Sequence, residues 1–84
     1  MKFYIPDHSE TIEDAVTIPK SSEFHSPRYF AEHAAEWCQY HRDGWEWRYP
    51  VDIAVIDDDG IEHVFVVERN FDPVFTACLK RVGI

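Results

Sequence analysis

The chain has 84 residues and a mass of 9.9 kDa, which allows a single domain over residues 1–84 with a modest core. Aromatic residues make up 15% of the sequence, too many for a chain that stays unfolded. Sixteen acidic against eight basic residues give a net charge of −8, which argues against direct binding to nucleic acid or to an anionic membrane. A field of this sign would attract a basic protein surface, although such a charge is also ordinary for a small soluble domain.

The first residues are expected to form short elements at the edge of a sheet. Residues Lys2–Ile5 predict a strand that ends at Pro6. Residues 14–18 predict a second strand, although residues 11–14 could instead open one helical turn.

A helix is predicted between Ser26 and Gly44. Ser26 is a good N-cap residue, Pro27 suits the first helical position, and Gly44 suits the position just after the helix. Five residues recur with the helical period and are expected to face the core: Phe30, Ala34, Trp37, Cys38 and His41. The opposite face is expected to be solvated and to carry Glu32, Glu36, Gln39 and Asp43.

A long strand is predicted after the helix. Apolar and polar residues alternate from Trp45 to Val55, which is typical of a strand with one buried face. Pro50 lacks a backbone donor and predicts an unpaired side or a bulge. The acidic residues 57–59 followed by Gly60 predict a turn in which the glycine takes a positive φ.

Two further strands are predicted over residues 61–68 and 74–79. Strands joined by short turns favour an antiparallel meander, and the helix needs a face to pack on. The sequence therefore predicts an α+β fold in which one α-helix packs across one face of an antiparallel β-sheet.

Metal binding and catalysis find little support in the sequence. Cys38 and His41 are three residues apart on the predicted helix, and Cys78 could approach from the sheet, but the paired ligand spacing of a zinc site is missing. With Gly60 at the glycine position of a calcium-binding loop, the first and last ligand positions are valines. Neither an oriented nucleophile nor a glycine-rich phosphate loop is recognisable. We therefore expect no metal, no cofactor and no enzymatic activity.

The compartment is predicted from the cysteines and from the hydropathy. Two cysteines do not make a disulfide framework, and both are expected to be small buried hydrophobic residues in a reducing cytoplasm. Neither a secretory signal nor a membrane-spanning apolar run is recognisable, so a cytoplasmic protein is expected.

The acidic residues are the best candidates for function. Acids four apart on a helix lie about 6 Å apart, and acids two apart on a strand lie about 7 Å apart, which is comparable to the phosphate spacing of a nucleic acid. Such a surface would compete for Lys and Arg side chains that bind phosphates, whereas the alternative is a solvated acidic face. The residues expected to contact a partner are Glu32, Glu36, Asp43, Asp57, Asp58, Asp59 and Glu62.

Several segments resemble small acidic proteins that bacteriophages and prophages encode. They are residues 43–47, the Asp-Asp-Asp-Gly turn, residues 66–69 with 71–75, and Phe3–Pro6 followed by residues 10–15. In size, acidity and α+β composition the chain is similar to anti-CRISPR proteins. The resemblance implies a non-enzymatic inhibitor that binds a basic surface of a host CRISPR effector and blocks its encounter with DNA. It implies no individual functional residue.

A different kind of function remains open at this stage. The sheet face away from the helix is expected to stay partly open, with Ala54, Ile56, Val64 and Val66 on it. An exposed apolar patch often marks an interface, so the alternative is a self-associating structural or accessory phage protein, for which a homodimer is the simplest form.

Overall fold

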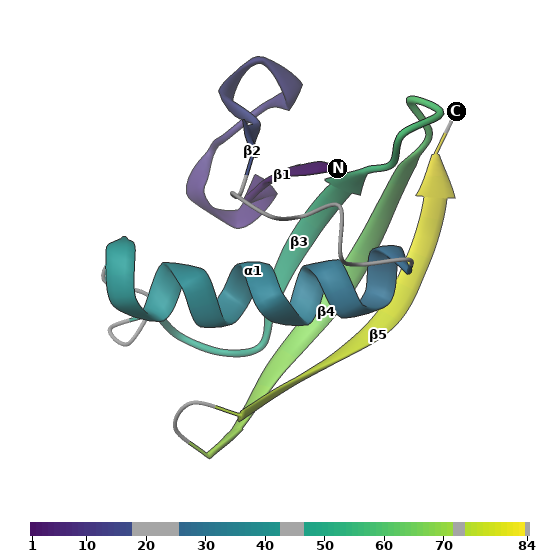
Figure 1. Cartoon of the computed structure of the whole chain (residues 1–84). Helices are drawn as coiled ribbons and strands as arrows, with labels where there is room; N and C mark the ends of the chain where they lie inside the picture. Colours follow the sequence, from purple (N-terminus) through teal and green to yellow (C-terminus); the bar gives the residue numbers. More distant parts are fainter. Residues whose placement is uncertain (18–25, 43–46, 72–73, 84) are drawn as a thin grey trace.

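The computed structural model describes residues 1–17, 26–42, 47–71 and 74–83 (Figure 1). It has a five-stranded antiparallel sheet with one α-helix packed against it, which confirms the α+β fold. The elements are β1 (Lys2–Tyr4), the 3₁₀ turns η1 (Pro6–His8) and η2 (Ile12–Asp14), β2 (Val16–Thr17), α1 (Pro27–His41), β3 (Val51–Ile56), β4 (Glu62–Phe71) and β5 (Val74–Gly83).

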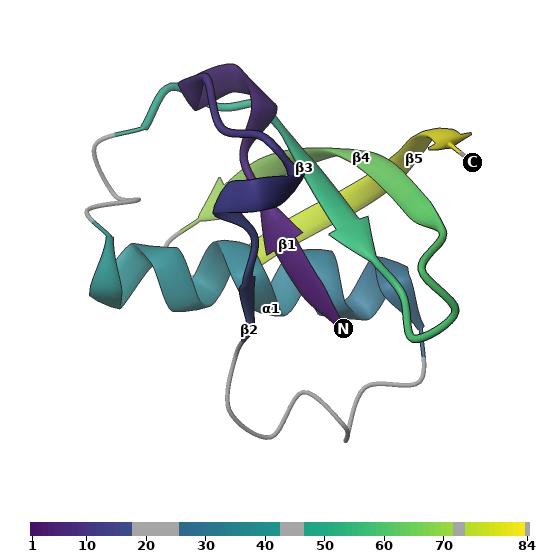
Figure 2. The ribbon, with the colours of Figure 1, turned by 90° about the horizontal axis from the view of Figure 1, so that it is seen from above.

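The sheet has the order β2-β1-β3-β4-β5. Phe3 of β1 is paired with Val16 of β2 on one side and with Val55 of β3 on the other. The chain passes from β2 through α1 to β3, and β3 pairs with β1 and not with β2. The predicted meander is therefore confined to β3, β4 and β5. Figure 2 shows α1 as a separate layer below the sheet.

The helix begins where the sequence predicts, with Ser26 as the extended N-cap residue and Pro27 at the first position. It ends at His41, and Gly44 lies outside the described residues. Two expectations for its faces are wrong, because Gln39 is buried and His41 is exposed. Alanines widen the buried stripe of α1, whose members are Phe30, Ala31, Ala34, Ala35, Cys38 and Gln39. Small side chains let this side of the helix lie close to the sheet, so the stripe extends toward Gln39.

The core lies between α1 and the sheet. Phe3 is fully buried at its centre, and its ring meets the rings of Phe30 at 6.2 Å and Trp37 at 6.1 Å in edge-to-face geometry. The strands contribute further buried side chains to this core: Val51, Ile53, Val55, Phe65, Val67, Phe75 and Ala77.

Strand β3 is shorter than its alternating pattern predicts. It begins at Val51, and Pro50 before it follows a cis peptide bond. Trp47 and Tyr49 lie outside the strand but pack against the core, so the alternation reflects burial rather than strand conformation. Trp45 lies outside the described residues.

The remaining elements follow the sequence with some differences in length. Gly60 has φ +83°, which confirms the predicted turn. The alternatives of a helical turn and a strand near residue 14 are both present, as η2 and β2. Strands β4 and β5 are longer than predicted, and register shifts interrupt their pairing between Val64 and Phe65 and between Arg69 and Phe71.

The sheet face away from α1 is closed as well, which corrects the expectation of an open apolar patch. Ala54, Ile56 and Val64 are 0%, 4% and 1% exposed, and only Val66 is partly exposed. The register places Tyr4 and Arg81 on this face beside Ala54 and Val64. Long polar side chains therefore lie beside the small apolar residues of the face that α1 does not cover.

Candidate protein-binding surface

Asp57 organises the turn between β3 and β4. Its Oδ1 atom accepts hydrogen bonds from the backbone N–H groups of Asp59 and Ile61, both at 2.9 Å, and its Oδ2 atom lies 2.8 Å from Nε2 of His63. The hydrogen bond with His63 and the backbone donors lower the pKa of Asp57 below its ordinary value of 3.8. Asp57 is therefore a fixed carboxylate at neutral pH.

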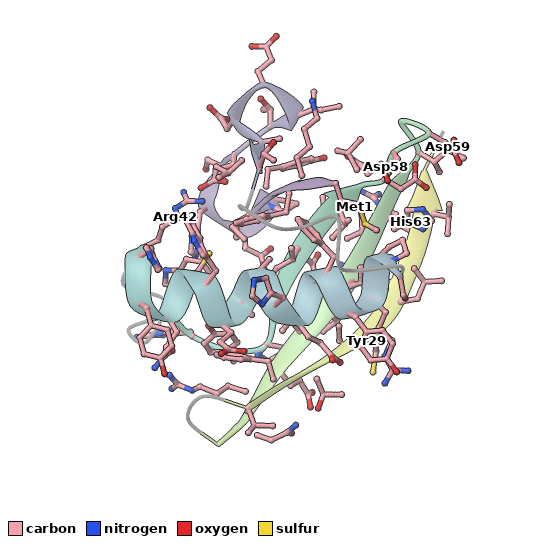
Figure 3. The ribbon with its side chains drawn as sticks, in the orientation of Figure 1. Met1, Tyr29, Arg42, Asp58, Asp59 and His63 are labelled. Carbon is pink, nitrogen blue, oxygen red and sulfur yellow. The ribbon has the colours of Figure 1, made fainter. Side chains whose placement is uncertain are left out.

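Asp58 and Asp59 lie at the tip of the same turn. The Asp58 side chain is 85% exposed, and its Oδ1 atom is 3.1 Å from the amino group of Met1. Asp59 is exposed and has no side-chain hydrogen bond or ion pair among the described residues. Figure 3 shows both aspartates at one end of the sheet, with Met1 and His63 close by.

Glu62 begins strand β4 and belongs to the polar cover of the face away from α1. Its Oε1 atom accepts a hydrogen bond from the Tyr4 hydroxyl. Burial, and then the neighbouring Glu62 carboxylate, raise the pKa of Tyr4 to about 12. The tyrosine thus stays neutral and holds an anionic glutamate in place.

The acids predicted on the helix behave differently from one another. Glu32 is partly buried, accepts the backbone N–H of Ala77 at 2.9 Å, and lies 3.8 Å from Nε of Arg28. Glu36 is exposed. Asp43 lies outside the described residues. The structure thus brings four of the seven predicted residues together at the turn and directs Glu32 toward the sheet instead of toward solvent.

Two other acids have structural roles that the sequence analysis did not identify. Glu10 accepts the backbone N–H of Ile5 and forms an ion pair with Arg42, which links the N-terminal segment to the end of α1. Asp7 accepts the backbone N–H of Asp52 at 2.7 Å. Sequence spacing carries no signal for the contact of Glu10 with Arg42 or for that of Asp7 with Asp52, because the two residues of each pair are distant in the chain.

The two thiols lie in different environments. Cys38 is fully buried in the core, and burial raises its pKa to about 12. Cys78 is exposed, so the expectation of two buried cysteines is wrong for this one. It lies on β5 opposite Val66, on the face that α1 does not cover.

The metal-binding candidates do not converge. His41 places its Nδ1 atom 3.0 Å from the carbonyl oxygen of Trp37, and its ring stacks on the Trp37 ring. Within the described residues, no three His, Cys, Asp or Glu side chains are grouped so that they could hold a metal ion.

Three of the seven candidate acids, Asp57, Asp58 and Glu62, are held by partners other than Lys or Arg. Among the described acids, Glu10, Glu32 and Asp52 form ion pairs with Arg or Lys side chains. Asp57, Asp58 and Glu62 are instead bound by backbone N–H groups, a tyrosine hydroxyl, a histidine or the terminal ammonium group. A neutral donor fixes a carboxylate but leaves its charge in place. Asp57 and Glu62 are therefore ordered anions, Asp58 is paired with the terminal ammonium group, and Asp59 is an exposed carboxylate beside them.

Comparison of the chain with protein-family models, curated proteins and solved structures found no match. In the part of the chain that the structure describes, no helix has the length and apolar character needed to cross a bilayer. A function must therefore be inferred from the surface chemistry of the chain itself.

Proposed function

We propose that this chain is a small non-enzymatic inhibitor that binds a basic, nucleic-acid-binding surface of another protein. The observation that carries the proposal is the group of carboxylates at the β3–β4 turn: Asp57, Asp58, Asp59 and Glu62. None of the four is paired with a Lys or Arg side chain among the described residues; Asp58 pairs with the terminal ammonium group of Met1, and the group as a whole stays strongly negative.

The order of these carboxylates supports binding. Asp57 accepts three hydrogen bonds and Glu62 accepts one, so these two side chains have little conformational freedom left to lose when a partner docks at the turn. A carboxylate that accepts one or two bonds retains further lone pairs, and Arg side chains of a partner can use them. Such charge-assisted contacts are the kind that Lys and Arg groups make with phosphates.

Several carboxylates must act together for this mechanism to work. A single exposed ion pair contributes about 0–1 kcal/mol, which is too little for a specific complex. A group of like charges also accelerates the encounter with an oppositely charged surface. We assign the main contacts to Asp58 and Asp59, with Glu36 as an additional exposed acid; Glu32 contributes least because it faces β5.

We propose further that the target is a CRISPR effector and that the inhibitor blocks target DNA binding, in the host cytoplasm, as an anti-CRISPR protein. The net charge of −8 and the resemblance to acidic phage proteins support this target class. An effector must hold its nucleic acids in positively charged channels, so it offers the type of surface that the turn acids fit.

The test uses the purified chain against a panel of purified CRISPR effector complexes. We expect one effector to bind the chain, to lose its target DNA in competition, and to bind more weakly as salt increases. The double variant Asp58→Asn/Asp59→Asn should reduce binding, whereas the matched control Glu13→Gln/Glu68→Gln, which removes the same charge from two other exposed positions, should reduce it much less. Binding that is insensitive to salt and equal in both variants would contradict the electrostatic mechanism.

Self-association is the alternative function, and its original basis is weakened. Three of the four residues expected in an open apolar patch, Ala54, Ile56 and Val64, are buried within the single chain. Light scattering over a concentration series separates the alternatives, since a structural protein of this kind must form at least a dimer.

A further inference from the structure

Strand β5 is a long outer strand of the sheet. It has ten residues and pairs with β4 on one side, whereas the other outer strand, β2, has two residues. Figure 1 shows β5 running along one border of the sheet. A long outer strand presents unpaired backbone N–H and C=O groups that can template pairing with another chain.

Exposed apolar side chains make this edge more prone to pairing. Leu79 is 56% exposed and Val82 is 52% exposed, and both lie on the α1 side of β5 according to their partners Phe65 and His63. Tyr29, from the first turns of α1, is 62% exposed. Among the described residues no strand pairs with the outer side of β5, and an outer strand with apolar side chains beside it is typical of an association site.

Glu32 blocks the middle of this edge. Its Oε2 atom accepts the backbone N–H of Ala77 at 2.9 Å. Because the N–H group of Ala77 is bound by a side chain of α1, it points away from β4. In an antiparallel pair of strands, the backbone groups of every second residue point in the same direction. The backbone groups that point away from β4 in this part of β5 are therefore those of Phe75, Ala77 and Leu79. The N–H group of the middle residue, Ala77, is already bound by Glu32.

The charge of Glu32 adds to the blocking effect. An approaching strand would bring a carbonyl oxygen to the Ala77 N–H, and the carboxylate occupies that position with a negative charge. Arg28, 3.8 Å from the carboxylate, helps to hold Glu32 in place. Further along the strand, Lys80 is an extra residue at the register shift between Leu79 and Arg81, an irregularity that also disfavours edge pairing.

We propose that Glu32 is an edge-blocking residue that prevents β5 from pairing with the β5 strand of a second copy of this chain. A second copy is the occupant that the blocking residue excludes, because every molecule in solution carries the same ten-residue edge. Antiparallel pairing of two β5 strands about a two-fold axis would form a closed dimer with one continuous sheet. Glu32 thus has a role that does not depend on binding of the chain to any partner.

The experiment compares the full chain with Glu32→Ala, Glu32→Gln and the control Glu36→Ala, which removes an exposed acid from the same helix. Amide hydrogen exchange at Ala77 and light scattering over a concentration series are measured for each protein. We expect the wild-type chain and Glu36→Ala to be monomers with a protected Ala77 amide. Glu32→Ala should exchange Ala77 about tenfold faster when dilute and should form dimers at higher concentration.

The glutamine variant separates the hydrogen bond from the charge. Its amide oxygen can still accept the Ala77 N–H, so we expect protection to remain close to the wild-type value. Adding Leu79→Lys to Glu32→Ala should restore the monomer, because a charge then replaces an apolar residue at the same edge.

Three results would overturn the proposal. The first is an unprotected Ala77 amide in the wild-type chain, which is decisive even if a variant fails to fold. The second is a Glu32→Ala protein that folds and remains monomeric at every concentration. The third is a Glu32→Ala dimer that persists after Leu79→Lys, since association would then use another surface. Effector binding enters none of these readouts, so failure here is distinguishable from failure of the proposed function.

Discussion

The two faces of the sheet bury apolar residues by different means. On the face toward α1, aromatic rings and alanines close a core around Phe3 and Phe30. On the other face, Ala54 and Val64 are as deeply buried, but beneath polar side chains such as Tyr4. Tyr4 donates to Glu62, and Lys80 bonds Asp52 at 2.6 Å on the same side.

The difference shows how a small domain can close a face on which its α-helix does not pack. Small apolar residues need only a thin cover, and a hydrogen-bonded tyrosine or an aliphatic lysine stem supplies it. The helix-side core should therefore contribute most of the stability, and the polar cover should contribute less while keeping the surface soluble. Variants on the two faces, and at the β3–β4 turn at the end of the sheet, can test this division.

The largest effect is expected at Phe30, because a buried ring in the helix-side core leaves a large cavity when it is removed. Phe30→Ala should lower the free energy of unfolding by about 3–5 kcal/mol in urea denaturation. Tyr29→Ala, at the neighbouring exposed position, should change it by about 0.5 kcal/mol or less. Equal losses in the two variants would contradict the proposed position of the core.

A smaller effect is expected at Asp57, in the turn between β3 and β4. Because the fold lowers its pKa, the carboxylate stabilises the fold fully above its ordinary value of 3.8, and this stabilisation disappears as the pH falls through the lower folded value. Asp57→Asn should therefore reduce the melting temperature near neutral pH, and the gap to the wild-type chain should close in acid. A gap that is constant with pH would contradict an ionic role.

Tyr4→Phe tests the polar cover directly. Loss of the hydroxyl that donates to Glu62 should cost about 1 kcal/mol or less near neutral pH. The pKa of Tyr4 is raised from 10.0 to about 12, so its neutral form stabilises the fold below pH 10 and this contribution is lost between these two values. Wild-type stability should thus fall more steeply than that of Tyr4→Phe in this alkaline range, as measured by denaturation at several pH values.

The cysteines should distinguish the two faces with no change in stability. A thiol reagent at mildly alkaline pH should label Cys78 rapidly in the folded chain, while Cys38 should react only after unfolding. Mass spectrometry counts the labels, and Cys78→Ser identifies the reactive position. Rapid labelling of both thiols in the native protein would show that the helix-side core is open.

The sequence predicted the features that depend on local pattern. The N-terminal start of α1, the Gly60 turn and the antiparallel sheet all follow from capping residues, turn chemistry and hydrophobic period. The pairing of β3 with β1 did not follow, because contacts between distant segments leave no periodic signal. Burial of Gln39 was missed for a related reason: the small residues around it, and not its own polarity, determine how closely the helix approaches the sheet.

The acidic surface was predicted only in part. The turn residues were recognised as a group because they are adjacent in sequence. The contact of Glu32 with Ala77 joins residues 45 positions apart, and a helical periodicity places Glu32 on the outer face without showing that it lies beside an edge strand. A charge count likewise cannot tell a carboxylate held by a backbone N–H from one paired with arginine, although only in the second case does a cation offset the negative charge.

The central claim is that the carboxylates grouped at the β3–β4 turn are negatively charged and bind a cationic protein surface. Its most direct test is the salt dependence of the dissociation constant for a purified CRISPR effector, measured with the wild-type chain and with Asp58→Asn/Asp59→Asn. We predict that affinity falls steadily with salt for the wild-type chain, and that the variant binds more weakly with a shallower salt dependence. Identical affinities and identical slopes for the two proteins would contradict the claim.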